Sequence, residues 1–261
     1  MHRPIGLFDS GFGGLTVMTE LAKLLPYENL IYLGDTAHVP YGNKSPATVL
    51  QYAIDNASFL MSKNIKLLII PCHTACSHAL KTLQELLSIP VIGVIQPGLA
   101  LVQPKNRIAI LATTSTIESG VYQSEILKHN PKAQIFPVSC PLFVPLIEEG
   151  FSNHPCAQLV ANTYLQPLKN KVDAALLACT HYPLLRPVIQ AALGAEVDLI
   201  EPAELCAQQA KELLAKSQLL NPQKNRPTYE FYASDDPEKF RQYGKLFFGL
   251  EIEKVEKNKN S

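Results

Sequence analysis

The sequence lacks several features that would mark it for particular classes of protein. Lys and Arg together equal Asp and Glu at 23 each, so the formal net charge is zero. This balance removes the bulk electrostatic reason to bind nucleic acid or an anionic membrane surface. No apolar run reaches the ~18 residues that a membrane span needs, and the first residues do not resemble a signal peptide. We therefore expect a cytoplasmic protein with neither a nucleic-acid nor a membrane partner.

Cysteine is also scarce, with six residues in 261. That number is too small for a disulfide scaffold, so each cysteine is expected to be buried, catalytic or metal-binding. Cys140, Cys156 and Cys206 have no chemical company nearby in the sequence and are expected to be small buried apolar residues. The glycine-rich segment DSGFGG, over 9–14, lacks the GxGxxG spacing of a dinucleotide site, which argues against a Rossmann cofactor.

Short apolar runs alternate with amphipathic stretches along the whole chain. Strands are expected over 5–10, 30–35, 67–71, 91–95, 107–113, 133–139, 174–178 and 198–202, with later strands near 228–234 and 250–257. Helices are expected over 15–25, about 46–62, about 73–87, 117–129, 155–168, 203–216 and 237–247. Such alternation, with near-continuous apolar strands, predicts parallel sheets covered by helices on both faces.

The alternation restarts near residue 107, so the two halves look like repeats of one another. We predict an α/β fold with two pseudo-symmetric lobes, residues 1–97 with 212–261 and residues 98–211, each with a mainly parallel sheet. In such sheets ligands bind at the carboxyl ends of the strands. The polar residues Asp9, Ser10, Thr113 and Thr114 fall at such ends, which predicts an active site in the cleft between the two lobes.

Two cysteines occupy matching points in the two halves. Cys72 follows the run LLIIP and precedes His73, and Cys179 follows AALLA and lies two residues before His181. A thiol at a helix N-terminus has its thiolate stabilised by the dipole and free amides, which predicts a lowered pKa. Two facing thiols are suited to removing a proton from one face of a carbon and returning it to the other face.

Metal binding is the competing interpretation of these cysteines. Cys72, Cys76 and His78 lie on one segment, and Cys179 with His181 would complete a coordination shell. The spacing matches no common zinc pattern such as paired CxxC motifs. A zinc-stabilised binding protein therefore remains an alternative, and acid–base catalysis is the favoured hypothesis.

Several segments, taken together, resemble the glutamate racemases of the aspartate/glutamate racemase superfamily. The matching stretches are GLFDSGFGGLTV, IYLGDTAHVPYGNKS, IIPCHTA, FVPLIEEG and ACTHYPLL, in order between residues 6 and 185. The resemblance implies an isomerase that interconverts L- and D-glutamate without a cofactor or metal and supplies D-glutamate for peptidoglycan synthesis. It is also compatible with a homodimer, although no residue in the sequence indicates an interface.

The resemblance implies a role for each residue of the site. Cys72 would act on the D-enantiomer with help from Asp9, and Cys179 on the L-enantiomer with help from His181 and Glu148. The substrate would be held by Asp9, Ser10, Pro40, Tyr41, Gly42, Cys72, His73, Thr74, Thr114, Cys179, Thr180 and His181.

One residue departs from the family's pattern. Where the family has Cys-Asn-Thr, this chain has Cys72-His73-Thr74. Histidine ordinarily titrates near neutral pH, so we expect His73 to lower the pKa of Cys72 or to weaken binding of the substrate amine. This departure keeps a second substrate in view, aspartate or another acidic amino acid on the same fold.

Overall fold

Short parallel strands flanked by helices build both parts of the chain in a computed structural model, which describes residues 3–223, 225–249 and 251–258. The described residues up to Val94 and those from Ala203 onward form one unit, and Ile95–Pro202 form the second. The predicted lobes, 1–97 with 212–261 and 98–211, divide the chain at nearby points. Their boundary at 211 falls inside helix α10 (Ala203–Lys216), which belongs to the first unit.

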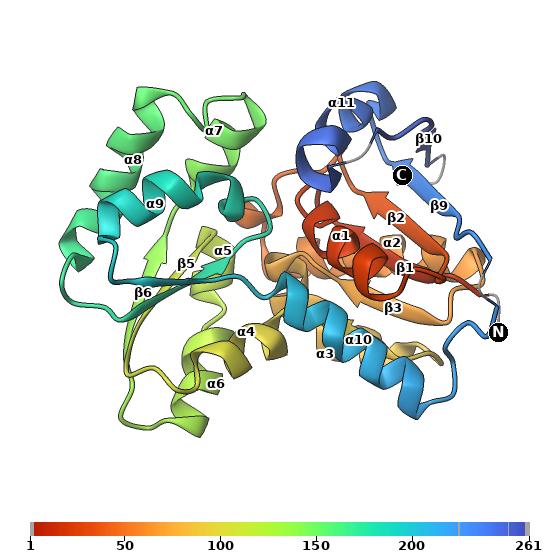
Figure 1. Ribbon diagram of the computed structural model, residues 1–261, viewed down its shortest axis with the longest axis horizontal. Helices are drawn as coiled ribbons and strands as arrows, with labels where there is room; N and C mark the ends of the chain where they lie inside the picture. Colours follow the sequence, from red (N-terminus) through yellow and green to blue (C-terminus); the bar gives the residue numbers. More distant parts are fainter. Residues whose placement is uncertain (1–2, 224, 250, 259–261) are drawn as a thin grey trace. The chain divides into compact units, whose positions relative to one another are not determined.

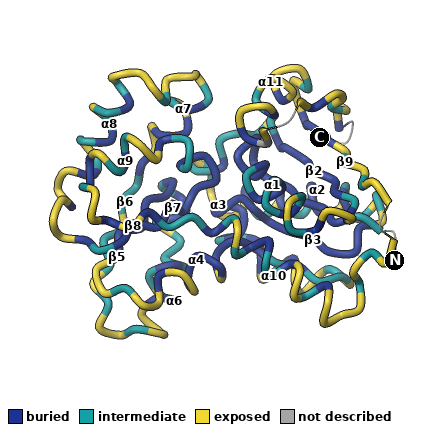
Figure 2. The backbone as a smooth tube through the Cα atoms, viewed as in Figure 1, coloured by how far each residue is buried: buried dark blue, intermediate teal, exposed yellow. Residues whose placement is uncertain are grey.

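The first unit has a six-stranded parallel sheet in which a late strand pairs with an early one. The strand order is β10-β9-β2-β1-β3-β4, and Figure 1 shows the blue β9 beside the orange β2. The strands are β1 (Ile5–Asp9), β2 (Leu30–Gly34), β3 (Leu67–Ile70), β4 (Val91–Gly93), β9 (Tyr229–Ala233) and β10 (Glu256–Lys257). Every residue of β1, β2 and β3 is buried, and these strands are dark blue in Figure 2.

Helices cover this sheet in two packed groups. Helix α1 packs against α10 and α11, and α2 packs against α3. Their bounds are α1 (Leu15–Leu24), α2 (Pro46–Ser62), α3 (His73–Leu86) and α11 (Pro237–Phe248), with a short 3₁₀ turn η1 (Tyr41–Asn43). The predicted start of α2 is confirmed, because Ser45 Oγ accepts a hydrogen bond from Thr48 N at 3.2 Å and Pro46 opens the first turn.

The second unit has a four-stranded parallel sheet of order β6-β5-β7-β8. Its strands are β5 (Arg107–Ala112), β6 (Gln134–Ser139), β7 (Ala174–Ala178) and β8 (Asp198–Ile200). Its helices are α4 (Ile95–Val102), α5 (Thr114–Glu118), α6 (Val121–His129), α7 (Phe143–Glu148), α8 (Pro155–Leu165) and α9 (Arg186–Leu193), with 3₁₀ turns η2 (Gln166–Leu168) and η3 (Tyr182–Leu185). The predicted α/β class with two parallel sheets is therefore confirmed.

Three of the differences between the predicted elements and the structure are the largest. The strand expected over 91–95 ends at Gly93, and helix α4 begins at Ile95. The single helix expected over 117–129 is two helices, because Gly120 adopts φ +66° between α5 and α6. Of the edge strand expected near 250–257, the described part forms strand only at Glu256–Lys257, and residue 250 lies outside the described residues.

A buried ion pair ties the chain after α10 to the first sheet. Lys66, just before β3, donates from Nζ to Glu28 Oε2 at 2.6 Å and to Leu219 O at 2.7 Å. Glu28 Oε1 also accepts from Asn221 N at 2.7 Å. Both charges are thus hydrogen-bonded as well as paired, which is the condition under which buried charges are tolerated.

Candidate active site

The predicted site residues form two groups, one in each unit. In the first unit Asp9 ends β1, and Cys72 lies two residues beyond the end of β3. Because β1 and β3 are parallel neighbours, their carboxyl ends lie at the same edge of the sheet. Local sequence therefore brings a carboxylate and a thiol to one place.

Cys72 is the N-cap residue of α3. Its Sγ accepts from Ala75 N at 3.4 Å and lies 3.7 Å from Ser10 Oγ, to which the thiol donates. Burial, and then the Asp9 carboxylate, raise the pKa of Cys72 from its ordinary value of 9.0 to about 12. The expectation of a lowered pKa is wrong for Cys72, since the helix N-terminus is outweighed by desolvation and by a neighbouring negative charge.

The Asp9 carboxylate is held by the turn that follows β1. Its Oδ1 accepts from Ser10 Oγ at 3.1 Å and from Gly11 N at 3.2 Å. Tyr32 Oη donates to Gly11 O at 2.9 Å, which fixes the turn from the neighbouring strand. A Cβ at Gly14 would lie 2.6 Å from Asp9 Oδ2. The glycine-rich segment thus lets a carboxylate pack directly against the start of α1.

The departure at position 73 has a different electrostatic effect from the one expected. His73 is the first residue of α3 and is buried, as is Thr74. Burial lowers the pKa of His73 to about 3, so the ring is neutral at neutral pH. His73 therefore brings no positive charge to lower the pKa of Cys72 or to repel a substrate amine.

The remaining predicted residues of the first unit lie in the segment after β2. Pro40 follows a cis peptide bond, and Tyr41 and Gly42 are the first two residues of the turn η1, which packs against α3. The Tyr41 phenol is near enough to Cys72 that a Cys72 thiolate would raise the pKa of Tyr41. Sequence reasoning did not single out Asp35 and Asn56, whose side chains bind this phenol.

In the second unit the thiol is linked to a carboxylate through a histidine. Cys179 follows β7, and its Sγ lies 4.0 Å from His181 Nδ1. His181 Nε2 lies 3.1 Å from Oε1 of Glu148, the last residue of α7. All three side chains are largely or fully buried. The structure thus places Glu148 at a helix end, where it contacts His181.

Threonines complete the second group at two strand ends. Thr114 opens α5 directly after β5, and its Oγ1 lies 2.6 Å from Ser139 Oγ at the end of β6. Thr180 is buried between Cys179 and His181 in the sequence. Ser139 was missed by sequence reasoning, although its position at the end of a parallel strand was the available signal.

The arrangement within each unit suits proton transfer. Each group offers a thiol at a strand end with a carboxylate either beside it or linked through one imidazole. No group of three or more His, Cys, Asp or Glu side chains among the described residues is arranged to hold a metal ion. No helix in the described part of the chain is long and apolar enough to cross a bilayer.

Comparison with known proteins agrees with this chemistry. The model of the Asp/Glu/Hydantoin racemase family matches residues 13–210. A glutamate racemase of Geobacter metallireducens is 46% identical over 95% of this chain and 93% of its own length. The crystal structure of glutamate racemase from Francisella tularensis in complex with D-glutamate is 40% identical and superimposes with a TM-score of 0.95, covering 100% of this chain and 98% of that one.

A more distant match shares the fold alone. Picrophilus torridus aspartate racemase is 16% identical, with a TM-score of 0.60 over 83% of this chain and 94% of that chain. The family model and the near full-length relative are decisive for the classification. On these grounds, with two strand-end thiols each associated with a carboxylate, the chain belongs to the Asp/Glu/Hydantoin racemase family.

Proposed function

We propose that the protein is a glutamate racemase in which Cys72 and Cys179 are the acid–base pair. One thiolate removes the α-proton, and the other thiol protonates the opposite face of the same α-carbon. The observation that carries this proposal is that each of two equivalent strand ends presents a buried thiol with a carboxylate in its network. The near full-length similarity to glutamate racemases supports glutamate as the substrate.

The two thiols have unequal surroundings, which supports different roles. Burial and Asp9 favour the protonated form of Cys72, whose pKa is raised to about 12. Cys72 is therefore ready to donate a proton when L-glutamate is converted, and Cys179 removes the proton in that direction. In the reverse direction Asp9 assists Cys72 as it deprotonates D-glutamate, and His181 and Glu148 assist Cys179.

The substrate's own charges supply what the buried thiols lack. The ammonium group carries a positive charge, and a nearby cation favours the thiolate over the thiol. Hydrogen-bond donors then stabilise the charge that develops when a weakly acidic α-proton leaves. We assign this binding to Ser10, Pro40, Tyr41, Gly42, His73, Thr74, Thr114 and Thr180 together with the catalytic residues.

The first experiment replaces each thiol and follows racemisation by circular dichroism. Cys72→Ser and Cys179→Ser are each expected to lose at least on the order of 10³-fold in kcat, because a positioned acid or base contributes up to about 10⁴-fold. Cys156→Ser, the same change at a partly exposed cysteine outside the site, is expected to retain activity. Substantial turnover in both site variants would rule out the two-thiol mechanism.

The choice of substrate needs a separate measurement, because aspartate racemase shares the fold. Chiral chromatography over glutamate, aspartate and other acidic amino acids is expected to show turnover of glutamate. Preferential turnover of aspartate would instead support the alternative substrate. Metal analysis of the purified protein tests the zinc-stabilised alternative, for which stoichiometric zinc without turnover would be the supporting result.

The proposed activity also defines a cellular role and an assembly to test. D-glutamate supplied for peptidoglycan synthesis places the enzyme in the cytoplasm with glutamate as its small-molecule partner and no cofactor. A homodimer is the assembly proposed on the resemblance, and light scattering coupled to size-exclusion chromatography measures it directly.

A further inference from the structure

We infer that Asp35 and Asn56 are positioning residues that hold the substrate-binding segment Pro40–Tyr41–Gly42 through the hydroxyl group of Tyr41. This inference rests on the proposed function, because it assigns how one part of that site keeps its shape. None of the sequence motifs gave Asp35 or Asn56 a role. The argument starts from a hydrogen-bond network at the end of β2.

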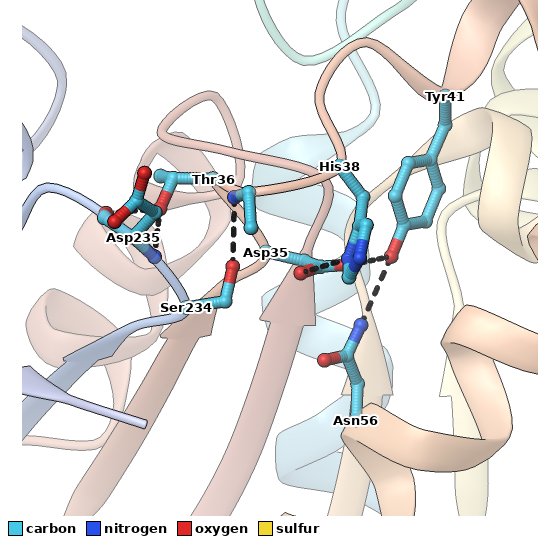
Figure 3. Close-up of polar contacts among 8 residues, drawn as sticks. Asp35, Thr36, His38, Tyr41, Asn56, Ser234 and Asp235 are labelled. Atoms are coloured by element: carbon cyan, nitrogen blue, oxygen red, sulfur yellow. Dashed lines mark hydrogen bonds and ion pairs between the residues drawn. The ribbon is translucent and has the colours of Figure 1, made fainter. Parts of the chain in front are cut away.

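The Tyr41 hydroxyl is the centre of this network. It donates to Asp35 Oδ2 and accepts from Asn56 Nδ2 at 3.0 Å. Figure 3 shows these three side chains converging from the end of β2, the turn η1 and helix α2. Their exposed fractions are 2% for Asp35, 1% for Tyr41 and 4% for Asn56. Buried hydrogen bonds of this kind are strong, and leaving one partner unpaired is costly.

Because its hydroxyl is already engaged, Tyr41 contributes to binding in a particular way. Burial and the Asp35 carboxylate raise the pKa of Tyr41 far above its ordinary value, so the hydroxyl keeps its proton and continues to donate to Asp35. The phenol thus anchors the segment in the interior of the unit. What remains for the substrate is the main chain of Tyr41 and Gly42, which the anchor fixes in place.

A half-exposed histidine extends the network toward the surface. His38 Nδ1 lies 2.8 Å from Asp35 Oδ1, and the ring stacks on Tyr52 of α2 with centroids 4.1 Å apart. The Tyr52 ring also contacts Tyr41, at 5.6 Å between centroids. His38 Nδ1 also lies 3.0 Å from Asp35 Oδ2, so His38 contacts both oxygens of Asp35, and Oδ2 accepts from the Tyr41 hydroxyl as well.

A second set of contacts holds the same loop from the other side. Ala37 N donates to Ser234 Oγ at 2.8 Å, and Asp235 N donates to Thr36 Oγ1 at 2.8 Å. Ser234 and Asp235, which are labelled in Figure 3, follow β9, and β9 pairs with β2 in the sheet. The loop after β2 is thus fixed at its start by the end of β9 and at its end by Asp35 and Asn56.

The position of this segment matters for the chemistry because of its neighbour. The turn η1 packs against α3, whose N-cap residue is Cys72, and the Tyr41 phenol is near enough to Cys72 that a Cys72 thiolate would raise the pKa of Tyr41. A shift of the segment therefore changes both the substrate contacts and the surroundings of one catalytic thiol. Misplacement by about 1 Å costs on the order of 10²-fold in well-studied enzymes.

The test compares two identical substitutions on adjacent rings. Tyr41→Phe removes the hydroxyl at the centre of the network, whereas Tyr52→Phe keeps the stacking on His38 and removes a hydroxyl outside the network. We expect Tyr41→Phe to raise KM for L-glutamate about tenfold or more, with a smaller change in kcat. Tyr52→Phe is expected to leave both constants within about twofold of the wild type, since it breaks no bond of the network.

A second pair separates positioning from catalysis. Asp35→Asn keeps two polar atoms facing Tyr41 and His38, and its amide oxygen can still accept from the Tyr41 hydroxyl, so KM is expected to stay within about threefold of the wild type. Asp35→Leu removes both and is expected to raise KM at least as much as Tyr41→Phe. If Asp35→Asn instead abolished kcat at unchanged KM, a proton-transfer role would replace the positioning role.

Thermal unfolding of every variant accompanies the kinetics. Equal KM values for folded Tyr41→Phe and Tyr52→Phe would overturn the inference, whatever happens to Asp35→Leu. A lowered melting temperature with unchanged KM would mean that the network serves stability alone, which also overturns it. Failure of the wild-type protein to racemise any acidic amino acid would instead contradict the proposed function.

Discussion

Gly14 is the position at which a substitution most directly disturbs the site residues of the first unit. Its φ of −63° is one that alanine adopts freely, so the backbone tolerates Gly14→Ala. The added Cβ would lie 2.6 Å from Asp9 Oδ2 and 2.8 Å from Tyr32 Oη. An ordinary contact begins at 3.4 Å, so the carboxylate must retreat by about 0.8 Å, the difference between the two distances. We expect this displacement to cost on the order of 10²-fold in kcat/KM.

Stability is expected to respond differently from activity. A glycine-to-alanine change at a compatible position stabilises by about 0.4–1 kcal/mol through the unfolded chain, which offsets part of the steric cost. Circular dichroism measures racemisation of L-glutamate, and thermal unfolding measures stability on the same samples. Gly98→Ala, a change inside helix α4, is the matched control, because the added Cβ would meet the side chain of Leu176 at an ordinary 3.4 Å. Full activity in Gly14→Ala would refute the reasoning, because it would mean that Asp9 need not occupy its present position.

Three further predictions concern charge. Asp9→Asn keeps the acceptor for the turn but removes a negative charge that raises the pKa of Cys72. Alkylation of Cys72 at pH 9, measured by peptide mass spectrometry, should therefore become faster. Slower labelling would contradict this prediction. His73 stays neutral in the folded state down to about pH 3, whereas in the unfolded chain it binds a proton below about pH 6.5. As the pH falls below 6.5, the free energy of unfolding should therefore decrease more steeply for the wild type than for His73→Asn. Urea titrations should show a difference of up to about 1.4 kcal/mol per pH unit. Lys66→Met leaves Glu28 buried without its cation and should lower the free energy of unfolding by about 3–5 kcal/mol, and a change below 1 kcal/mol would contradict this.

The fold was largely predictable because its strands are short apolar runs that end at polar residues. The strand Ala174–Ala178 and the helix Ala203–Lys216 have the predicted bounds. Helix α4 was missed because Pro97 and Gly98, which ordinarily interrupt a helix, lie inside it. The break at Gly120 was missed because only the tertiary structure shows that its φ is positive.

The site was predictable in its residue types but not in its electrostatics. A cysteine at a strand end and a helix start can be located from sequence, and Cys72 is the N-cap residue of α3. The sign of its pKa shift depends on burial and on Asp9, which lies 63 positions away in the chain. Burial also keeps His73 neutral, whereas an ordinary histidine pKa, near neutrality, was expected from the sequence. Desolvation is a property of the packed structure and leaves no local signal.

The order of strands in the first sheet has a consequence for synthesis on the ribosome. Strand β2 pairs with β9, and Lys66 donates to the backbone carbonyl of Leu219, 153 positions later, so the first unit needs chain that is made long after its own early strands. The nascent N-terminal segment therefore leaves one edge of β2 unpaired while the whole of Ile95–Pro202 is being translated. The second unit is continuous in sequence and is complete first. A premature stop anywhere before β9 would release a chain whose first sheet lacks β9 and β10.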